Sequence, residues 1–254
     1  MNKKLISLIS GTLLLTAMVV GAYSYWDAPK PVAKISFPLG NVLVLPSGKT
    51  KLVKAGFNRP LYNGDKIKTQ PSARCEIKYN DGSIVRIDER SIYTIERAEI
   101  KKKEKKVESF LSVGRIWANI KKLAQNTDQW LLRGPSAVVA VRGTVYRMDA
   151  AEDKTSRILV YEGSVNVAPP GWQPGQQQQQ GGQNPPGPPQ RVQGPTQVKG
   201  PSVVSLKEWI EIVKAQQQIV VKPDGSFQKS DFDAVADAKS SWVQWNLERD
   251  KLIK

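Results

Sequence analysis

Few residues in this chain have the types and spacing that catalysis requires. Its 254 residues include no histidine, which excludes Ser-His-Asp triads, Cys-His pairs and histidine-ligated metals. Cys75 is the single cysteine, so the chain can form neither an internal disulfide nor a cysteine-ligated metal site. Asp88 and Glu89 are adjacent on a predicted turn, and we expect them to point different ways rather than flank a substrate. We therefore expect a non-enzymatic protein without cofactor or metal, with a histidine-independent hydrolase as the least favoured alternative.

The strong positive charge indicates an anionic partner. Lysine and arginine total 38 against 23 acidic residues, which gives a formal net charge of +15. The densest basic run, residues 101–106, falls between two predicted strands and is typical of a solvated loop. It has no interleaved aromatic residues on which bases could stack, so we expect no nucleic-acid partner.

The N-terminus resembles an export signal. Lys3 and Lys4 precede residues 5–26, which include no charged residue. Residues 1–26 therefore fit either a signal peptide cleaved after Ser24 or a retained membrane anchor. Both alternatives predict an exported protein, periplasmic or extracellular, that is secreted or anchored by an N-terminal hydrophobic helix. The anionic polymers at that location belong to the cell envelope.

Residues 34–168 show the pattern of short β-strands joined by tight turns. A glycine is repeatedly followed, two positions later, by an apolar residue that begins a predicted strand. This unit begins at Gly40, Gly82, Gly114, Gly143 and Gly163.

Residues 73–79 illustrate the strand pattern, because apolar and charged residues alternate with period two. We expect one buried and one wet face, with Cys75 as a small core residue on the apolar side. Residues 80–82, Asn-Asp-Gly, predict a hairpin turn directly afterwards.

Several of these segments together resemble the FecR domain. Residues 40–44, 61–69 and 73–87 are similar to its opening, and 113–117 to its central strand. Residues 134–146, GPSAVVAVRGTVY, are similar to the family signature TPTAVAAVRGT, and 160–165 to the closing strand. The resemblance implies a mainly β fold of short stacked strands, solenoid-like or rolled, over roughly residues 36–168.

The resemblance also marks signature residues, to which we assign structural roles. These are Gly64, Asp65, Asp81, Gly82, Trp117, Arg142, Gly143, Thr144, Glu162 and Gly163. We expect the Arg142 guanidinium to cap backbone carbonyls or to pair with Asp81, Asp65 or Glu162. The functional alternative is an anion site at Arg142.

Beyond residue 168 the chain changes character twice. Residues 169–201 are rich in proline, glycine and glutamine and predict a disordered loop, while 202–228 predict the final strands of the β domain. Residues 230–254 predict an amphipathic helix with Asp231 as N-cap. Trp242, Trp245 and Arg249 lie on one face of it, which either docks on the β domain or binds a partner.

The FecR resemblance implies a sensor or binding module in the cell envelope that engages a protein partner or an anionic envelope polymer. FecR itself relays a surface signal to a sigma factor through a cytoplasmic N-terminal segment. Here about four residues precede the hydrophobic stretch, so we do not expect direct anti-sigma activity. The alternative is a structural surface or periplasmic scaffold.

Overall fold

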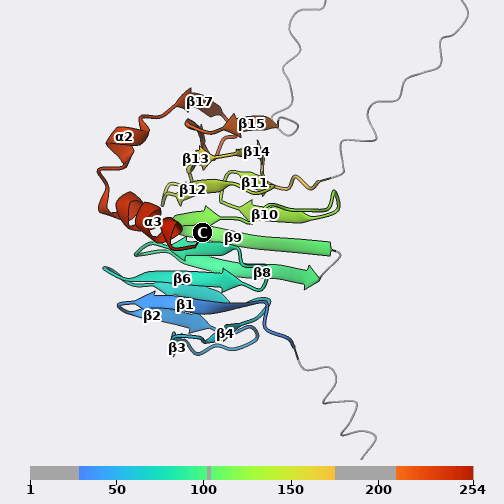
Figure 1. The fold of residues 1–254 in the computed structure, drawn as a ribbon, viewed down its shortest axis with the longest axis vertical. Helices are drawn as coiled ribbons and strands as arrows, with labels where there is room; N and C mark the ends of the chain where they lie inside the picture. The colour runs from blue at the N-terminus through green and yellow to red at the C-terminus, as the bar shows by residue number, and fades with distance from the viewer. Residues whose placement is uncertain (1–28, 102–103, 175–209, 254) are drawn as a thin grey trace, which may run out of the picture. The chain divides into compact units, whose positions relative to one another are not determined.

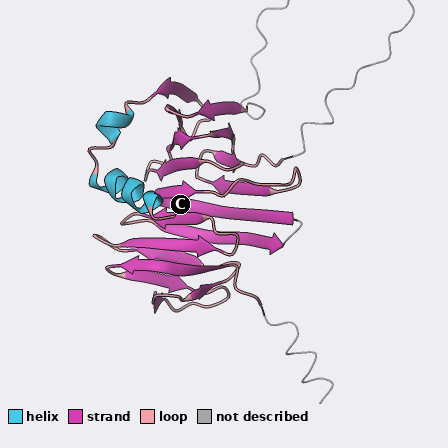
Figure 2. Ribbon diagram, viewed as in Figure 1, coloured by secondary structure: helices cyan, strands magenta, loops and turns pink. Residues whose placement is uncertain are grey.

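The computed structural model describes residues 29–101, 104–174 and 210–253. Residues 32–254 form one compact unit. Its described residues form seventeen strands and two helices, coloured by type in Figure 2. The predicted N-terminal helix and most of the predicted disordered loop lie outside the described residues.

The strands form two sheets, sheet A and sheet B. In spatial order sheet A contains β4 (Pro60–Leu61), β1 (Ala33–Leu39), β6 (Arg74–Tyr79), β7 (Ile84–Ile87), β9 (Glu104–Asn119), β12 (Val145–Ala150), β13 (Ser156–Glu162), β16 (Gln217–Val221) and β17 (Phe227–Asp231). Sheet B contains β3 (Val53–Lys54), β2 (Val42–Leu45), β5 (Lys66–Thr69), β8 (Ile92–Lys101), β9, β10 (Gln129–Arg133), β11 (Val138–Val141), β14 (Ser164–Ala168) and β15 (Glu211–Lys214).

The long strand β9 belongs to both sheets and joins them. Its first part pairs with β8 and β10 in sheet B, and its last part, from Gly114 to Asn119, pairs with β7 and β12 in sheet A. The chain thus winds back and forth between two layers while it adds strands from one end to the other (Figure 1). This arrangement confirms the predicted mainly β fold of short stacked strands.

The main hydrophobic core lies between the two sheets. Tyr79 of sheet A and Tyr93 of sheet B are fully buried, and their hydroxyl oxygens are 2.8 Å apart in a hydrogen bond that crosses the core. The Tyr79 ring also packs edge-on against Trp130, with ring centroids 4.9 Å apart. Cys75 is buried in this core, as predicted, and burial followed by the nearby Glu76 charge raises the pKa of its thiol to about 12.

The five predicted turn glycines all have positive φ, as the sequence pattern predicts. The values are 73° at Gly40, 87° at Gly82, 99° at Gly114, 95° at Gly143 and 83° at Gly163. All except Gly82 lie where the chain passes from one sheet to the other. The repeated glycine unit is therefore the local signal for a crossing between layers.

Two local predictions need correction. The basic run is not simply a loop, because β8 extends to Lys101 and β9 begins at Glu104, while residues 102–103 lie outside the described residues. The C-terminal segment is not one helix from residue 230: α2 (Ala234–Asp237) and α3 (Ser241–Lys251) are separate. Asp231 belongs to β17, and the N-cap is Asp233, whose carboxylate accepts from the N–H groups of Val235 and Ala236.

Gly143 provides a test of the crossings. An added Cβ there would lie 2.7 Å from the Lys122 Cα, in a backbone region that L side chains avoid. Gly48 has φ +69° but nothing within 4 Å of such a Cβ, so Gly48→Ala should cost only the conformational penalty, about 1–2 kcal/mol. We expect Gly143→Ala to lower the thermal midpoint clearly more than Gly48→Ala. Equal midpoints for the two variants would contradict the close approach at this crossing.

Candidate functional site

The outer face of sheet A has a row of large polar and aromatic residues that the C-terminal helices cover. Glu76, Arg86, Trp117 and Arg147 are cross-strand neighbours on β6, β7, β9 and β12. We call these four residues the docking row. Each is at most 5% exposed, although the face that they occupy points away from the main core. Their burial therefore depends on what lies over the sheet.

Arg86 is at the centre of the docking row and has no exposed surface. Its Nε donates to Glu76 Oε2 at 2.7 Å, and its Nη1 donates to Asp250 Oδ1 of α3 at 2.7 Å. Nη1 also lies 3.3 Å from the main-chain oxygen of Asn246, which is itself fully buried in α3. One buried guanidinium thus joins a carboxylate of the sheet to a carboxylate of the helix.

Glu76 receives a second guanidinium from α3. Arg249 Nε and Nη2 donate to the two Glu76 carboxylate oxygens at 2.9 and 3.1 Å, and Ser36 Oγ donates to Oε1 at 2.8 Å. Burial alone would raise the pKa of Glu76, but hydrogen bonds from Arg249, Arg86 and Ser36 lower it to about 2. With Asp250, the cluster has two carboxylates and two guanidinium groups, so its formal charges balance.

Aromatic rings surround this ionic cluster. Trp242, 2% exposed, stacks on Trp245 with ring centroids 5.4 Å apart, and the Arg74 guanidinium lies 5.3 Å from both centroids. Trp117 Nε1 donates to Asp250 Oδ2 at 2.9 Å. Asp250 therefore contacts two members of the docking row, and the tryptophans shield these contacts from water.

The short helix α2 is held in a similar way. Asp237 Oδ1 accepts from Arg147 Nη1 at 2.8 Å, and Asp237 Oδ2 accepts from the Tyr161 hydroxyl. Burial, the first cause, raises the pKa of the Tyr161 hydroxyl well above its usual range, and its hydrogen bond to Asp237 adds to this. Each helix thus presents an aspartate to a buried arginine that projects from sheet A.

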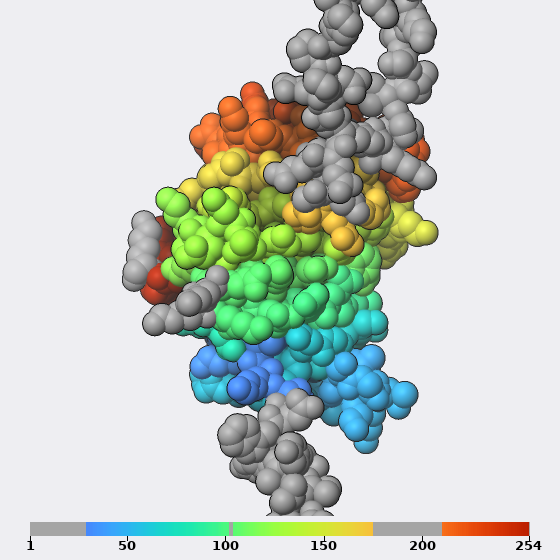
Figure 3. All heavy atoms as spheres, turned by 90° about the vertical axis from the view of Figure 1, so that its right-hand side faces the viewer, coloured from blue at the N-terminus to red at the C-terminus, as the bar shows by residue number. Residues whose placement is uncertain are grey.

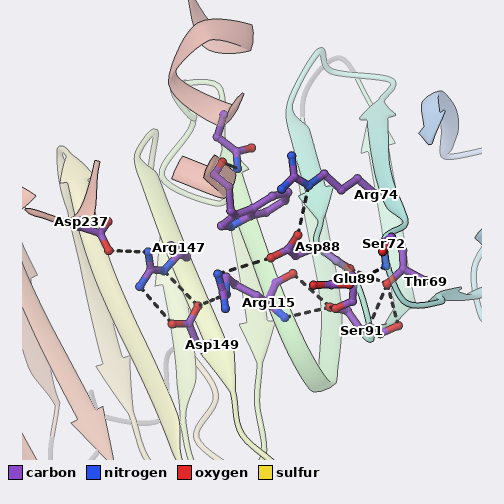
Figure 4. Close-up of polar contacts among 12 residues, drawn as sticks. Thr69, Ser72, Arg74, Asp88, Glu89, Ser91, Arg115, Arg147, Asp149 and Asp237 are labelled. Atoms are coloured by element: carbon purple, nitrogen blue, oxygen red, sulfur yellow. Dashed lines mark hydrogen bonds and ion pairs between the residues drawn. The ribbon is translucent and has the colours of Figure 1, made fainter. Parts of the chain in front are cut away.

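Beside the docking row lies a second row of charged residues, which is half-buried except at Asp88, a residue that is 7% exposed. Asp88, Arg115, Asp149 and Arg157 alternate in sign across β7 to β13, and we call them the charged row (Figure 4 shows the first three). Arg115 Nη1 lies 3.5 Å from Asp88 Oδ2, and Arg115 Nε lies 3.6 Å from Asp149 Oδ1. Burial raises the pKa of both aspartates, and the neighbouring arginines oppose that shift.

A hollow of about 380 Å³ opens over the charged row. Asp88, Glu89, Arg90, Arg115, Asp149 and Glu152 are its charged lining residues. Arg115 lies between the two aspartates, and Glu89 accepts from the main-chain N–H of Ser72 at 2.6 Å.

Several signature residues make hydrogen bonds within turns. Asp65 is 2% exposed and accepts from the main-chain N–H groups of Ser47 and Tyr62, at 2.9 and 3.0 Å. Asp81 accepts at 2.9 Å from both the main-chain N–H and the hydroxyl of Ser83, in the predicted hairpin that includes Gly82. These contacts fix turns rather than form a ligand site.

Three signature residues are sequence neighbours of the crossing glycines Gly143 and Gly163: Arg142, Thr144 and Glu162. Arg142 Nη2 donates to the Gln125 carbonyl at 3.0 Å, so it caps a carbonyl, and among the described residues it forms no ion pair with the predicted carboxylates. Thr144 Oγ1 donates to the Ser164 carbonyl at 2.8 Å. Glu162 is exposed and lines a hollow of about 550 Å³ beside α3.

The structure brings together Trp117, Trp242, Trp245 and Arg249, which the sequence marked in separate segments. Of the two predicted roles for the helix, the contacts show docking on the domain. The sequence reasoning missed the residues that they dock against, chiefly Glu76, Arg86, Arg147, Asp237 and Asp250. Glu76 was placed on a wet face because it alternates with apolar residues, but α3 covers that face.

Within the described ranges, no group of three or more cysteine, aspartate or glutamate residues could hold a metal ion. No helix in the described part of the chain is long and apolar enough to cross a membrane.

Glu76→Gln tests the ionic cluster. Removal of this charge takes away the carboxylate that Arg249 pairs with and leaves Arg86 paired, among the described residues, with Asp250 alone. Breaking such a buried pair costs on the order of 3 kcal/mol. Glu248→Gln is the matched control, because Glu248 lies exposed on the same helix. We expect a lower thermal midpoint and faster tryptic cleavage within α3 for Glu76→Gln only. Similar values for the two variants would show that the cluster does not hold the helix.

The pKa of Glu76 predicts how acid affects the helix. Folding lowers this pKa from 4.5 to about 2. The ionised carboxylate therefore stabilises the folded state fully at pH values above 4.5. That contribution is lost as the pH falls between these two values. Tryptophan fluorescence should therefore report a docked α3 at pH 5 and its release below about pH 4. A release centred above pH 5, or one unchanged by Glu76→Gln, would argue against this role.

Comparison with known proteins agrees with the resemblance noted in the sequence. The FecR protein family model matches residues 65–166. No curated protein shows a significant match. Two crystal structures of a proposed anti-sigma factor from Parabacteroides distasonis ATCC 8503 share 18% and 17% identity with this chain and cover 66% and 69% of it, with TM-scores of 0.44 and 0.45. The matches span 60% and 64% of those proteins. From the Asp65 turn to β14, the chain therefore contains a FecR domain.

Proposed function

We propose that this protein is a non-enzymatic, extracytoplasmic FecR-type sensor or binding module that engages a protein partner through the charged row of sheet A. One observation carries the proposal: the docking row is closed by the chain's own helices, whereas the adjacent charged row opens into a hollow. The FecR family match supports a regulatory or sensor class. The uncharged stretch at residues 5–26 supports a location outside the cytoplasm.

The charged row suits selective recognition. Asp88, Arg115 and Asp149 alternate in sign at about one strand spacing, so a partner needs a matching order of charges to pair with them. A partner with the wrong order would bury like charges against each other, which costs several kcal/mol. Arg115 and Asp149 lie in β9 and β12, and Asp88 directly follows β7, where its main-chain N–H donates to the Arg115 carbonyl. This fixes the spacing of the row before a partner arrives.

The scaffold alternative rests on a different feature, the edge strand β17. All five of its residues are exposed, and among the described strands it pairs only with β16. An exposed edge can add a strand from another chain, and this would favour assembly through the main chain rather than through the charged row.

Photo-cross-linking in cells separates the two functions. A cross-linking residue replaces Arg90, at the hollow, or Gln228, on β17; both positions are exposed. We expect position 90 to capture one discrete envelope protein and to lose it when Arg115→Glu reverses the central charge. A melting curve of the Arg115→Glu variant controls for unfolding. Capture at position 228 alone would favour the scaffold, and indiscriminate capture at both positions would contradict the proposal.

A further inference from the structure

The two ends of the strand stack differ sharply in charge. Strands β3 and β4 form one end, and β15 and β17 form the other (Figure 1). Residues 32–70, which include the first end, have seven basic residues and one acidic residue, Asp65. Residues 210–233, at the other end, have three basic and four acidic residues. The positive charge is therefore concentrated at the β3–β4 end.

The basic side chains at this end have no internal partners that would account for them. Lys49, Lys51 and Lys54 are exposed, and none takes part in an ion pair within the described part of the chain. Asp65, the nearby acidic residue, is buried and accepts from two main-chain N–H groups. The charge is thus available to an external anionic surface.

Lysines at a sheet edge can serve simply to prevent aggregation, and that explanation fits Lys54 on the two-residue strand β3. It does not explain the apolar residues that accompany them. Phe57, in the turn between β3 and β4, is 70% exposed, and Leu52, just before β3, is 42% exposed. Figure 3 shows this blue segment at the lower end of the stack, where it projects from the surface.

Exposed aromatic and leucine side chains among lysines are the combination that binds a membrane surface. The apolar groups enter the interface, and the lysines contact the headgroup phosphates. In the sequence, only residues 27–32 separate the uncharged stretch from β1, whose first residue Ala33 pairs with Leu61 of β4. A membrane segment at 5–26 would thus hold this end at a high effective concentration near lipid.

We propose that the β3–β4 end, with Leu52 and Phe57 among Lys49, Lys51 and Lys54, docks on an anionic phospholipid surface. The charged row lies in the middle of the stack, on β7 to β13, and remains accessible to a protein partner in this orientation. The lipid contact does not depend on the protein partner. A failure to bind lipid would therefore leave the proposed partner binding at the charged row untouched, and the reverse also holds.

A fluorescence experiment on the full chain tests the contact. Phe57→Cys is labelled with an environment-sensitive dye, and Phe227→Cys at the opposite end serves as the matched control. The native Cys75 is buried and its pKa is raised, which protects it from labelling. The labelled proteins are reconstituted into phosphatidylethanolamine vesicles with or without phosphatidylglycerol, and quenchers in the lipid phase report depth.

We expect a blue shift and lipid-phase quenching at position 57 only when phosphatidylglycerol is present. The signal should weaken at high salt and in the triple variant Lys49→Glu, Lys51→Glu, Lys54→Glu. An aqueous spectrum at position 57 in both vesicle types would overturn the proposal. A blue shift that instead follows protein concentration without vesicles would also overturn it, because self-association would then cover this end.

Discussion

Burial of the Arg86 guanidinium is the constraint on which the rest of the structure depends. A charge with no exposed surface is tolerated only when carboxylates and hydrogen-bond acceptors surround it, and here these come from both β6 and α3. The sheet cannot supply them alone. The C-terminal helix is therefore an integral part of the β unit, and its docking defines which part of sheet A stays open.

The glycine crossings make that docking face possible. Because the chain passes between layers at Gly40, Gly114, Gly143 and Gly163, neighbouring strands of sheet A come from distant parts of the sequence. Residues from β6, β7, β9 and β12 then align in one row. A single two-layer frame thus places a closed ionic cluster, an open charged row and a basic end at separate positions on one unit.

The sequence predicted what is locally encoded and missed what depends on register. Short stretches of sequence were enough to predict the turn glycines, the alternating strands, the core position of Cys75 and the FecR signature. Glu76 shows the opposite case: its alternation with apolar neighbours is typical of a solvent-facing residue. Nothing nearby in the sequence indicates that Arg249, 173 residues later, lies in a helix that covers it. The Asp231 N-cap was wrong because β17 continues through that residue.

Hydrogen exchange of the α3 main-chain amides in the full-length protein tests the central claim most directly. If the buried cluster holds the helix on sheet A, the hydrogen-bonded amides from Gln244 to Asp250 exchange about as slowly as those of β7 and β9, and Arg86→Met speeds exchange in α3 before it affects the strands. Exchange of these amides at the rate of an unstructured peptide, or protection that Arg86→Met leaves unchanged, would contradict the account.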